Sequence, residues 1–158
     1  LPGVGAFAAF MDGLRARGLD IAMREVLLRG DPLLGICVGM QALFDVGEEL
    51  GETPGLGLLA GRVKRFPDLP GLKVPHTGWN QLWFAQPSPL FNGLESGDYA
   101  YFNHSFYCSA QAEDTLAQTD YGINYASAVK RDNLWGVQFH PEKSQRVGQT
   151  ILENFFKL

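Results

Sequence analysis

The chain has 158 residues, of which 46% are hydrophobic and 19% are charged, and its formal net charge is −4. A chain of this length buries enough surface to fold as one domain without disulfide or metal cross-links. The acidic balance and the lack of any lysine or arginine run argue against nucleic acid or a membrane surface as the main partner, and no apolar run is long enough to span a bilayer.

The first part of the chain alternates helical and strand patterns. Apolar residues recur at helical spacing from about Phe7 to Arg17 and from about Asp20 to Gly30, which predicts two helices. The uninterrupted apolar run at 33–37 predicts a strand buried on both faces, and 40–44 predicts a third helix. Glycines mark 47–61 as a loop region.

The second part of the chain is richer in strands. They are predicted at 62–66, 98–108, 115–121, 125–131 and 135–140, before a closing helix whose apolar face runs from Val147 to Phe156. This order predicts an α/β fold in which helices flank a central, mostly parallel sheet with an additional β-rich segment. The sequence shows no repeat or linker, so we expect residues 1–158 to form a single domain.

The segment Gly35-Ile36-Cys37-Val38-Gly39 lies where the predicted buried strand meets a helix. This is the arrangement of a G-x-nucleophile-x-G elbow, with cysteine in place of serine. Glycine is needed two residues to either side because larger side chains would collide at such a sharp turn. The N-terminus of the following helix lowers the pKa of a thiol, and its free N–H groups bind a developing oxyanion. An isolated GxCxG pattern is equally compatible with a small apolar cysteine at a tight turn.

His140 ends the apolar run 134–139 and is followed by Pro141 and Glu142. In an extended segment, residues two apart face the same side, so Glu142 can bind one imidazole nitrogen while the other faces a thiol. By itself this pattern also fits a surface histidine at a strand end. Combined with the GxCxG elbow, it predicts a catalytic triad of Cys37, His140 and Glu142.

Cysteine and histidine could instead ligate zinc, but the sequence has no CxxC, HxxxH or HExxH spacing. We therefore expect neither a metal nor another cofactor. The only two cysteines, Cys37 and Cys108, are more typical of a reducing compartment than of a disulfide framework, so we expect a cytoplasmic protein.

Several segments together resemble the class I, or triad-type, glutamine amidotransferases. The nucleophile segment is Gly35-Ile36-Cys37-Val38-Gly39-Met40-Gln41, and the base segment is Phe139-His140-Pro141-Glu142. Four more segments are similar to the glutaminase subunits of imidazole glycerol phosphate synthases: Pro2-Gly3-Val4-Gly5-Ala6-Phe7, Pro75-His76-Thr77-Gly78-Trp79-Asn80, Tyr101-Phe102-Asn103-His104-Ser105 and His140-Pro141-Glu142-Lys143-Ser144. Members of this family carry a strand, a helix and a strand ahead of the Pro2-Gly3 loop, so we expect an N-terminal part of the domain to be missing from this chain.

The resemblance implies that Cys37 attacks the side-chain amide of glutamine, forms a glutamyl thioester and releases ammonia. The ammonia would pass to a (β/α)₈ cyclase subunit in a heterodimer that makes imidazole glycerol phosphate for histidine biosynthesis. The residues that the resemblance implies for the oxyanion are Gly3, Val4, Gly5 and Val38. Those implied for the amino-acid end of glutamine are Gln41, Glu49, His104, Ser105 and Phe106, with Glu49 paired to the α-ammonium. Those implied for the cyclase interface are Trp79, Tyr101 and Lys143.

The same residues are compatible with other roles. Trp79 and Tyr101 could be core aromatics, and Lys143 could be an ordinary solvated lysine. The same glutaminase chemistry could serve another acceptor, as in anthranilate, guanylate or pyridoxal phosphate synthases, or act on γ-glutamyl peptides. A non-catalytic binding subunit of the same fold is the alternative from a different class, and the intact triad argues against it.

Overall fold

The structure of the chain, a computed structural model, describes every residue from Leu1 to Leu158. Its α-helices are α1 (Phe7–Ala16), α2 (Leu19–Leu28), α3 (Val38–Gln41) and α4 (Gln145–Phe155). Three short 3₁₀ turns are η1 (Pro89–Phe91), η2 (Ala112–Asp114) and η3 (Pro141–Lys143). Three of the four predicted helices are confirmed, whereas the one predicted over 40–44 is the single turn α3, which ends at Gln41. None of the helices is both long and apolar enough to cross a membrane.

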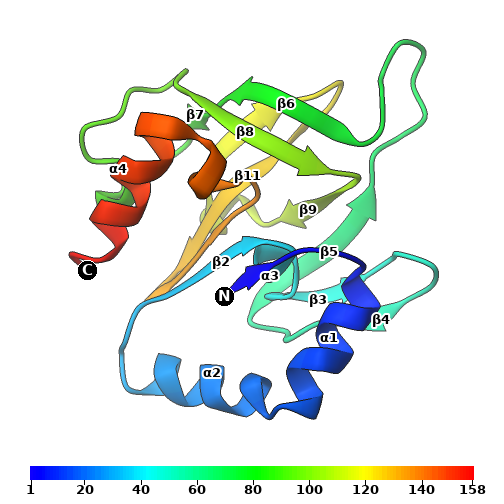
Figure 1. The fold of residues 1–158 in the computed structure, drawn as a ribbon, viewed down its shortest axis with the longest axis vertical. Coiled ribbons are helices and arrows are strands. Elements are labelled where there is room, and N and C mark those ends of the chain that lie inside the picture. The colour runs from blue at the N-terminus through cyan, green and yellow to red at the C-terminus, as the bar shows by residue number, and fades with distance from the viewer.

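The strands form one large sheet and one separate pair (Figure 1). In chain order they are β1 (Pro2–Gly3), β2 (Leu33–Cys37), β3 (Phe44–Gly47), β4 (Thr53–Pro54), β5 (Leu59–Arg65), β6 (His76–Gln81), β7 (Trp83–Phe84), β8 (Tyr99–His104), β9 (Phe106–Ala110), β10 (Thr115–Asp120), β11 (Asn124–Arg131) and β12 (Leu134–Val137). The large sheet has the order β1-β2-β12-β11-β9-β5-β3-β4, with β10 bridging β11 and β7. The separate pair is β6 with β8.

The predicted α/β class is confirmed, but the large sheet is mixed and not mostly parallel. Parallel pairing is confined to β1 with β2, β2 with β12, and β3 with β5. All other pairs are antiparallel. For consecutive strands such as β11 and β12 the physical reason is connection length, because a short turn such as Asp132-Asn133 can join only antiparallel neighbours.

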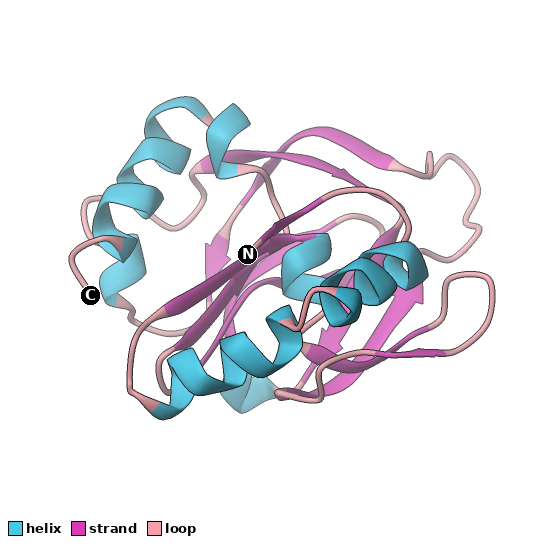
Figure 2. Cartoon of the chain, turned by 60° about the horizontal axis from the view of Figure 1, so that its bottom comes forward, coloured by secondary structure: helices cyan, strands magenta, loops and turns pink.

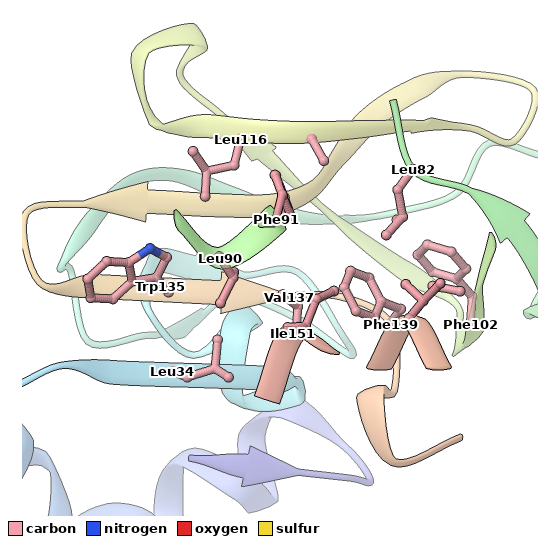
Figure 3. Close-up of a cluster of buried hydrophobic side chains, with 14 of the residues drawn as sticks. Leu34, Leu82, Leu90, Phe91, Phe102, Leu116, Trp135, Val137, Phe139 and Ile151 are labelled. Carbon is pink, nitrogen blue, oxygen red and sulfur yellow. The ribbon is translucent and has the colours of Figure 1, made fainter. Parts of the chain in front are cut away.

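Two hydrophobic cores lie on opposite sides of the large sheet. Leu33 and Leu34 are consecutive in β2, so their side chains point to opposite faces and enter different cores. The core with Leu33 contains buried residues of α1 and α2, the helices that cross one face of the sheet in Figure 2. The core with Leu34 contains Ile151 of α4, which packs near Val137 in Figure 3. The strand β2 that leads to Cys37 is therefore held from both sides.

Three further differences from the sequence predictions concern the strands. The strand predicted over 98–108 is broken at Ser105 into β8 and β9, which belong to different sheets. The predicted loop region 47–61 contains β4 and the start of β5. Strand β6 was not predicted, since its polar and glycine residues give no apolar alternation.

Candidate active site

Cys37 occupies the turn between the end of β2 and the start of α3. Its backbone has φ 55° and ψ −114°, a strained conformation for a residue with a side chain. A Cβ atom on Gly35 would lie 2.7 Å from the Gly39 carbonyl oxygen, and one on Gly39 would collide with the carbonyl of Leu1. Both glycines are therefore required by backbone packing, as the GxCxG spacing predicts.

The thiol of Cys37 is buried beside the side-chain amide of Gln138. The side-chain nitrogen of Gln138 donates to Sγ over 3.8 Å, and the side-chain oxygen of Gln138 accepts from Gln41 over 3.1 Å. Burial raises the pKa of Cys37 to about 11, and hydrogen bonds from the Val38 N–H and from Gln138 act in the opposite direction. The sequence-based expectation of a lowered thiol pKa is thus wrong for this state, because desolvation outweighs the turn's N–H groups.

His140 follows β12 and has its imidazole oriented by Glu142. The Nδ1 atom of His140 donates to a carboxylate oxygen of Glu142 over 2.9 Å, which leaves the lone pair on Nε2. The pairing was expected from an extended segment, but Pro141 starts a 3₁₀ turn and brings Glu142 back toward the ring. The hydrogen bond therefore forms, although the local geometry is not the one assumed from the sequence.

The hydroxyl of Ser144 ties the His140 turn to strand β8. It donates to the His140 carbonyl over 2.7 Å and accepts from the Tyr101 N–H over 2.9 Å. The His140 N–H in turn donates to the Tyr101 carbonyl over 2.9 Å. Both backbone polar groups of Tyr101 are therefore used to hold the turn that carries the imidazole.

Cys37 and His140 both line a cavity of about 300 Å³. Its other lining residues include Val4, Gly5, Val38, Gln41, Glu49, His104, Ser105, Phe106 and Lys143. Of the residues expected at the oxyanion and substrate positions, only Gly3 lies outside the lining, in β1 directly beside Cys37. A larger hollow of about 680 Å³ between Phe84 and Leu94 has no titratable side chain in its lining.

Glu49 and Gln41 are already engaged in hydrogen bonds within the cavity wall. A carboxylate oxygen of Glu49 accepts from the Phe7 N–H over 2.6 Å, where α1 begins without any cap from Ala6. The amide nitrogen of Gln41 donates to the Phe106 carbonyl over 3.1 Å as well as to Gln138. These bonds fix the two side chains in place before any ligand is bound.

The three residues expected at a partner interface form one continuous surface cluster. Trp79 of β6 and Tyr101 of β8 are register partners, with ring centroids 6.0 Å apart. The Lys143 ammonium lies 5.9 Å from the centre of the Tyr101 ring, and Trp79 is 46% exposed. Because Lys143 also lines the cavity, this cluster (Trp79, Tyr101 and Lys143) reaches from the outer surface to the mouth of the site.

Gln138 was missed by the sequence reasoning, which treated 134–139 simply as an apolar run. The usable signal was the polar residue itself, since an amide inside a buried strand must find a partner. Gln138 has no exposed surface, and its partners are Cys37 and Gln41. No three His, Cys, Asp or Glu side chains are grouped so that they could hold a metal ion.

The fold and this site define a class of protein. The family model for glutamine amidotransferase class-I matches residues 1–158, and the chain belongs to that family. Imidazole glycerol phosphate synthase subunit HisH of Moorella thermoacetica is 52% identical over 159 residues, which cover 100% of this chain and 75% of that protein. The subunit of the same name from Dehalococcoides mccartyi is 52% identical over 159 residues, which cover 100% of this chain and 77% of that protein.

Solved structures share the fold. PurLQS from Thermotoga maritima matches with a TM-score of 0.71 and 18% identity, over 99% of this chain and 77% of that chain. A glutamine amidotransferase from the same organism matches with a TM-score of 0.65 and 18% identity, over 99% of this chain and 60% of that chain. The family and the α/β fold predicted from the sequence are therefore both confirmed.

Proposed function

We propose that the chain is the glutaminase subunit of an imidazole glycerol phosphate synthase and that Cys37, His140 and Glu142 are its catalytic triad. The single observation that carries the chemistry is the shared cavity of Cys37 and His140, with Glu142 bound to the far nitrogen of the imidazole. A nucleophile, a base and a carboxylate that orients the base are the parts needed for acyl transfer. Membership of the amidotransferase family supports glutamine as the acyl donor.

In the first half of the proposed reaction, the thiol proton of Cys37 moves to Nε2 of His140 as Sγ attacks the amide carbon of glutamine. The oxyanion accepts hydrogen bonds from the Val38 N–H and from the backbone at Gly3, Val4 and Gly5. The imidazolium then gives its proton to the amide nitrogen, the C–N bond breaks and ammonia leaves. The enzyme is left as a γ-glutamyl thioester.

In the second half, His140 takes a proton from a water molecule that attacks the thioester carbon. The C–S bond breaks, the proton returns to sulfur, and glutamate is released. Because burial raises the pKa of Cys37 to about 11, the resting thiol is protonated near pH 7, so its proton must pass to His140 before or during attack.

The amino-acid end of glutamine is proposed to lie against Gln41, Glu49 and the backbone of 104–106. Glu49 is half-buried in the cavity wall, and its carboxylate suits the α-ammonium of the substrate. The peptide groups of His104, Ser105 and Phe106 offer neutral polar contacts to the same end. This arrangement would leave the side-chain amide of glutamine directed at Cys37.

The partner is proposed to be a (β/α)₈ cyclase that receives the ammonia, in a heterodimer. The relatives carry the name of a synthase subunit, which supports a second subunit. The cluster of Trp79, Tyr101 and Lys143 beside the cavity is a suitable contact surface, because tryptophan and tyrosine are enriched at interfaces. We place the protein in the cytoplasm, where its two free thiols stay reduced.

The test is a glutamine hydrolysis assay, measured as glutamate release, with and without the cyclase and its nucleotide ligand. We expect slow release by the subunit alone and a strong increase in the complex. Hydrolysis that does not respond to the cyclase would refute the assigned partner. No hydrolysis in either sample would refute the glutaminase itself.

A further inference from the structure

A buried cluster of His76, His104 and Tyr125 reaches the cavity wall at His104, and the proposed reaction uses none of its side chains. The Tyr125 hydroxyl is 3.2 Å from Nδ1 of His76 and 3.2 Å from Nε2 of His104, and these two nitrogens are 3.3 Å apart. Each of the three residues is at most 6% exposed. They come from β6, β8 and β11, which run close together in Figure 1.

The surrounding hydrogen bonds decide where the protons of this cluster lie. Nδ1 of His104 is 2.7 Å from the Phe106 carbonyl oxygen, so it must carry a proton and leave Nε2 as an acceptor. Nε2 of His76 is 3.3 Å from the side-chain nitrogen of Asn80, which can only donate. Nδ1 of His76 is therefore the protonated nitrogen of that ring.

Asn80 is itself fixed in this orientation. Its nitrogen donates to the Asp120 carbonyl over 2.8 Å, and its oxygen accepts from the Gln81 N–H over 2.8 Å. The path of donation that uses the Tyr125 hydroxyl runs from Asn80 to His76, to Tyr125, to His104 and finally to the Phe106 carbonyl. The His76 N–H also lies 3.3 Å from Nε2 of His104, so both His76 and Tyr125 face the nitrogen that accepts.

Burial keeps the cluster in this protonation state at neutral pH. It lowers the pKa of His76 to about 4 and of His104 to about 3, so both rings are neutral. It also raises the pKa of Tyr125 well above its usual value, so the hydroxyl keeps its proton. The rings of Phe102 and Tyr121 stack on His76 and further exclude water.

The end of the chain of hydrogen bonds is part of the active-site wall. His104 and Phe106 line the cavity, and the Phe106 carbonyl also accepts from Gln41. In the other tautomer, the lone pair on Nδ1 of His104 would face this carbonyl oxygen at 2.7 Å, and repulsion would displace the backbone. His76 and Tyr125 do not line the cavity, and the hydrogen bonds that connect them to it pass through His104.

We infer that His76 and Tyr125 are positioning residues of the glutamine site, which hold His104 in its Nδ1–H tautomer and thereby fix the backbone of residues 104–106. The inference rests on the proposed glutaminase function for its kinetic consequence, whereas the tautomer itself is independent of that function. Loss of the donor at Tyr125 should therefore weaken glutamine binding more than it slows the chemical step.

The test is the Tyr125→Phe variant, which keeps the ring and removes only the hydroxyl. In the complex with the cyclase, we expect KM for glutamine to rise about tenfold while kcat changes less than about threefold. The matched control is Tyr107→Phe, since the Tyr107 ring packs on Phe66 and Tyr125 and its hydroxyl makes no hydrogen bond in the structure. The control should keep both constants.

A second readout on the chain, nitrogen NMR of the imidazoles, does not depend on activity. We expect the wild-type spectrum to show a proton on Nδ1 of His104. In Tyr125→Phe, the Nε2 resonance of His104 should shift toward the position of an imidazole nitrogen that accepts no hydrogen bond. A wild-type spectrum with Nε2–H on His104 would overturn the inference. Failure of wild-type glutamine hydrolysis would refute the proposed function and leave this NMR test intact.

Substitutions at His76 separate hydrogen bonding from packing. His76→Phe keeps the stacked ring and removes the donor, so it should raise KM as Tyr125→Phe does. His76→Asn restores an N–H near the position of Nδ1 and should recover part of the affinity. An unchanged KM in both Tyr125→Phe and His76→Phe, with normal thermal stability, would overturn the inference. The inference would also be overturned if the activity of these variants fell only in proportion to the fraction of protein that is folded.

Discussion

Nδ1 of His140 lies 2.9 Å from a carboxylate oxygen of Glu142, and this contact determines which imidazole nitrogen can act as a base. Glu142 reaches the ring from a 3₁₀ turn and is itself 56% exposed. Its influence on His140 is therefore that of an orienting group partly screened by water.

Replacement of Glu142 should slow the chemical step in a graded order. Glu142→Ala removes the acceptor for Nδ1–H and the charge that stabilises imidazolium, and should lower kcat about a hundredfold. Glu142→Gln keeps an oxygen acceptor without the charge, and its kcat should lie between those of the wild type and Glu142→Ala. Steady-state glutaminase kinetics measure both, and Glu153→Ala, which removes an exposed carboxylate on α4, is the control. An unchanged kcat in Glu142→Ala would contradict the assigned role.

The two cysteines should behave in opposite ways. Cys37→Ala removes the proposed nucleophile and should lower glutamate release by at least about a thousandfold. Cys108→Ala leaves only a small cavity in the core, so it should keep the activity and lose about 1–2 kcal/mol of unfolding free energy. Hydrolysis retained by Cys37→Ala would show that the thiol is not the nucleophile.

Alkylation of Cys37 should report its raised pKa. Because burial disfavours the thiolate, the fraction of anion increases about tenfold per pH unit until the pKa of about 11 is approached. In a Cys108→Ala background, the iodoacetamide rate constant of the free chain should therefore keep rising from pH 7 to pH 10. A plateau near pH 8 or 9 would mean an ordinary or lowered pKa.

Acid should destabilise the fold through the two buried histidines. Their pKa values of about 4 and about 3 lie below the unfolded value near 6.5, so the unfolded chain binds more protons between these limits. Stability present above pH 6.5 is then lost as pH falls, by up to about 1.4 kcal/mol per pH unit for each ring. Urea unfolding from pH 7 to pH 4.5 measures this, and His76→Phe should reduce the slope by about one ring's share. Equal slopes would exclude His76 as a contributor.

Lys143→Ala should affect the partner more than the substrate. Loss of the ammonium beside Tyr101 should weaken association with the cyclase about five- to tenfold, with a smaller change in KM for glutamine. Titration of the subunit with the cyclase, followed by glutaminase activity, separates the two effects. Lys130→Ala is the matched control, because Lys130 makes a similar contact with Trp135 elsewhere on the chain. The idea fails if both variants respond to the cyclase like the wild type.

What the sequence could predict was set by local geometry. The glycines around Cys37 are demanded by the backbone atoms of one turn, so the GxCxG spacing is visible in a single segment. The pair His140 and Glu142 is also local, which is why the contact could be expected even though the turn was taken for an extended segment. The surface cluster at Trp79 came from the resemblance and not from any pattern of burial.

What could not be predicted depends on strands distant in sequence. Gln138 reaches the thiol because β12 lies parallel to β2, with Val137 paired to Ile36 across about a hundred residues of chain. The raised pKa of Cys37 follows from burial by the whole fold, so the turn alone predicted a pKa shift in the wrong direction. The mixed sheet likewise reflects which strands meet, and no segment specifies that by itself.

The Ser144 hydroxyl joins the backbone of Tyr101 to that of His140, and the mutual backbone bond of the two residues adds a second tie. Tyr101, whose ring belongs to the surface cluster, and His140, the proposed base, are thus joined through their backbones. A protein bound against Tyr101 cannot shift strand β8 without moving His140 or breaking these hydrogen bonds. If the proposed cyclase binds over Tyr101, its binding and the position of His140 are coupled through these three hydrogen bonds.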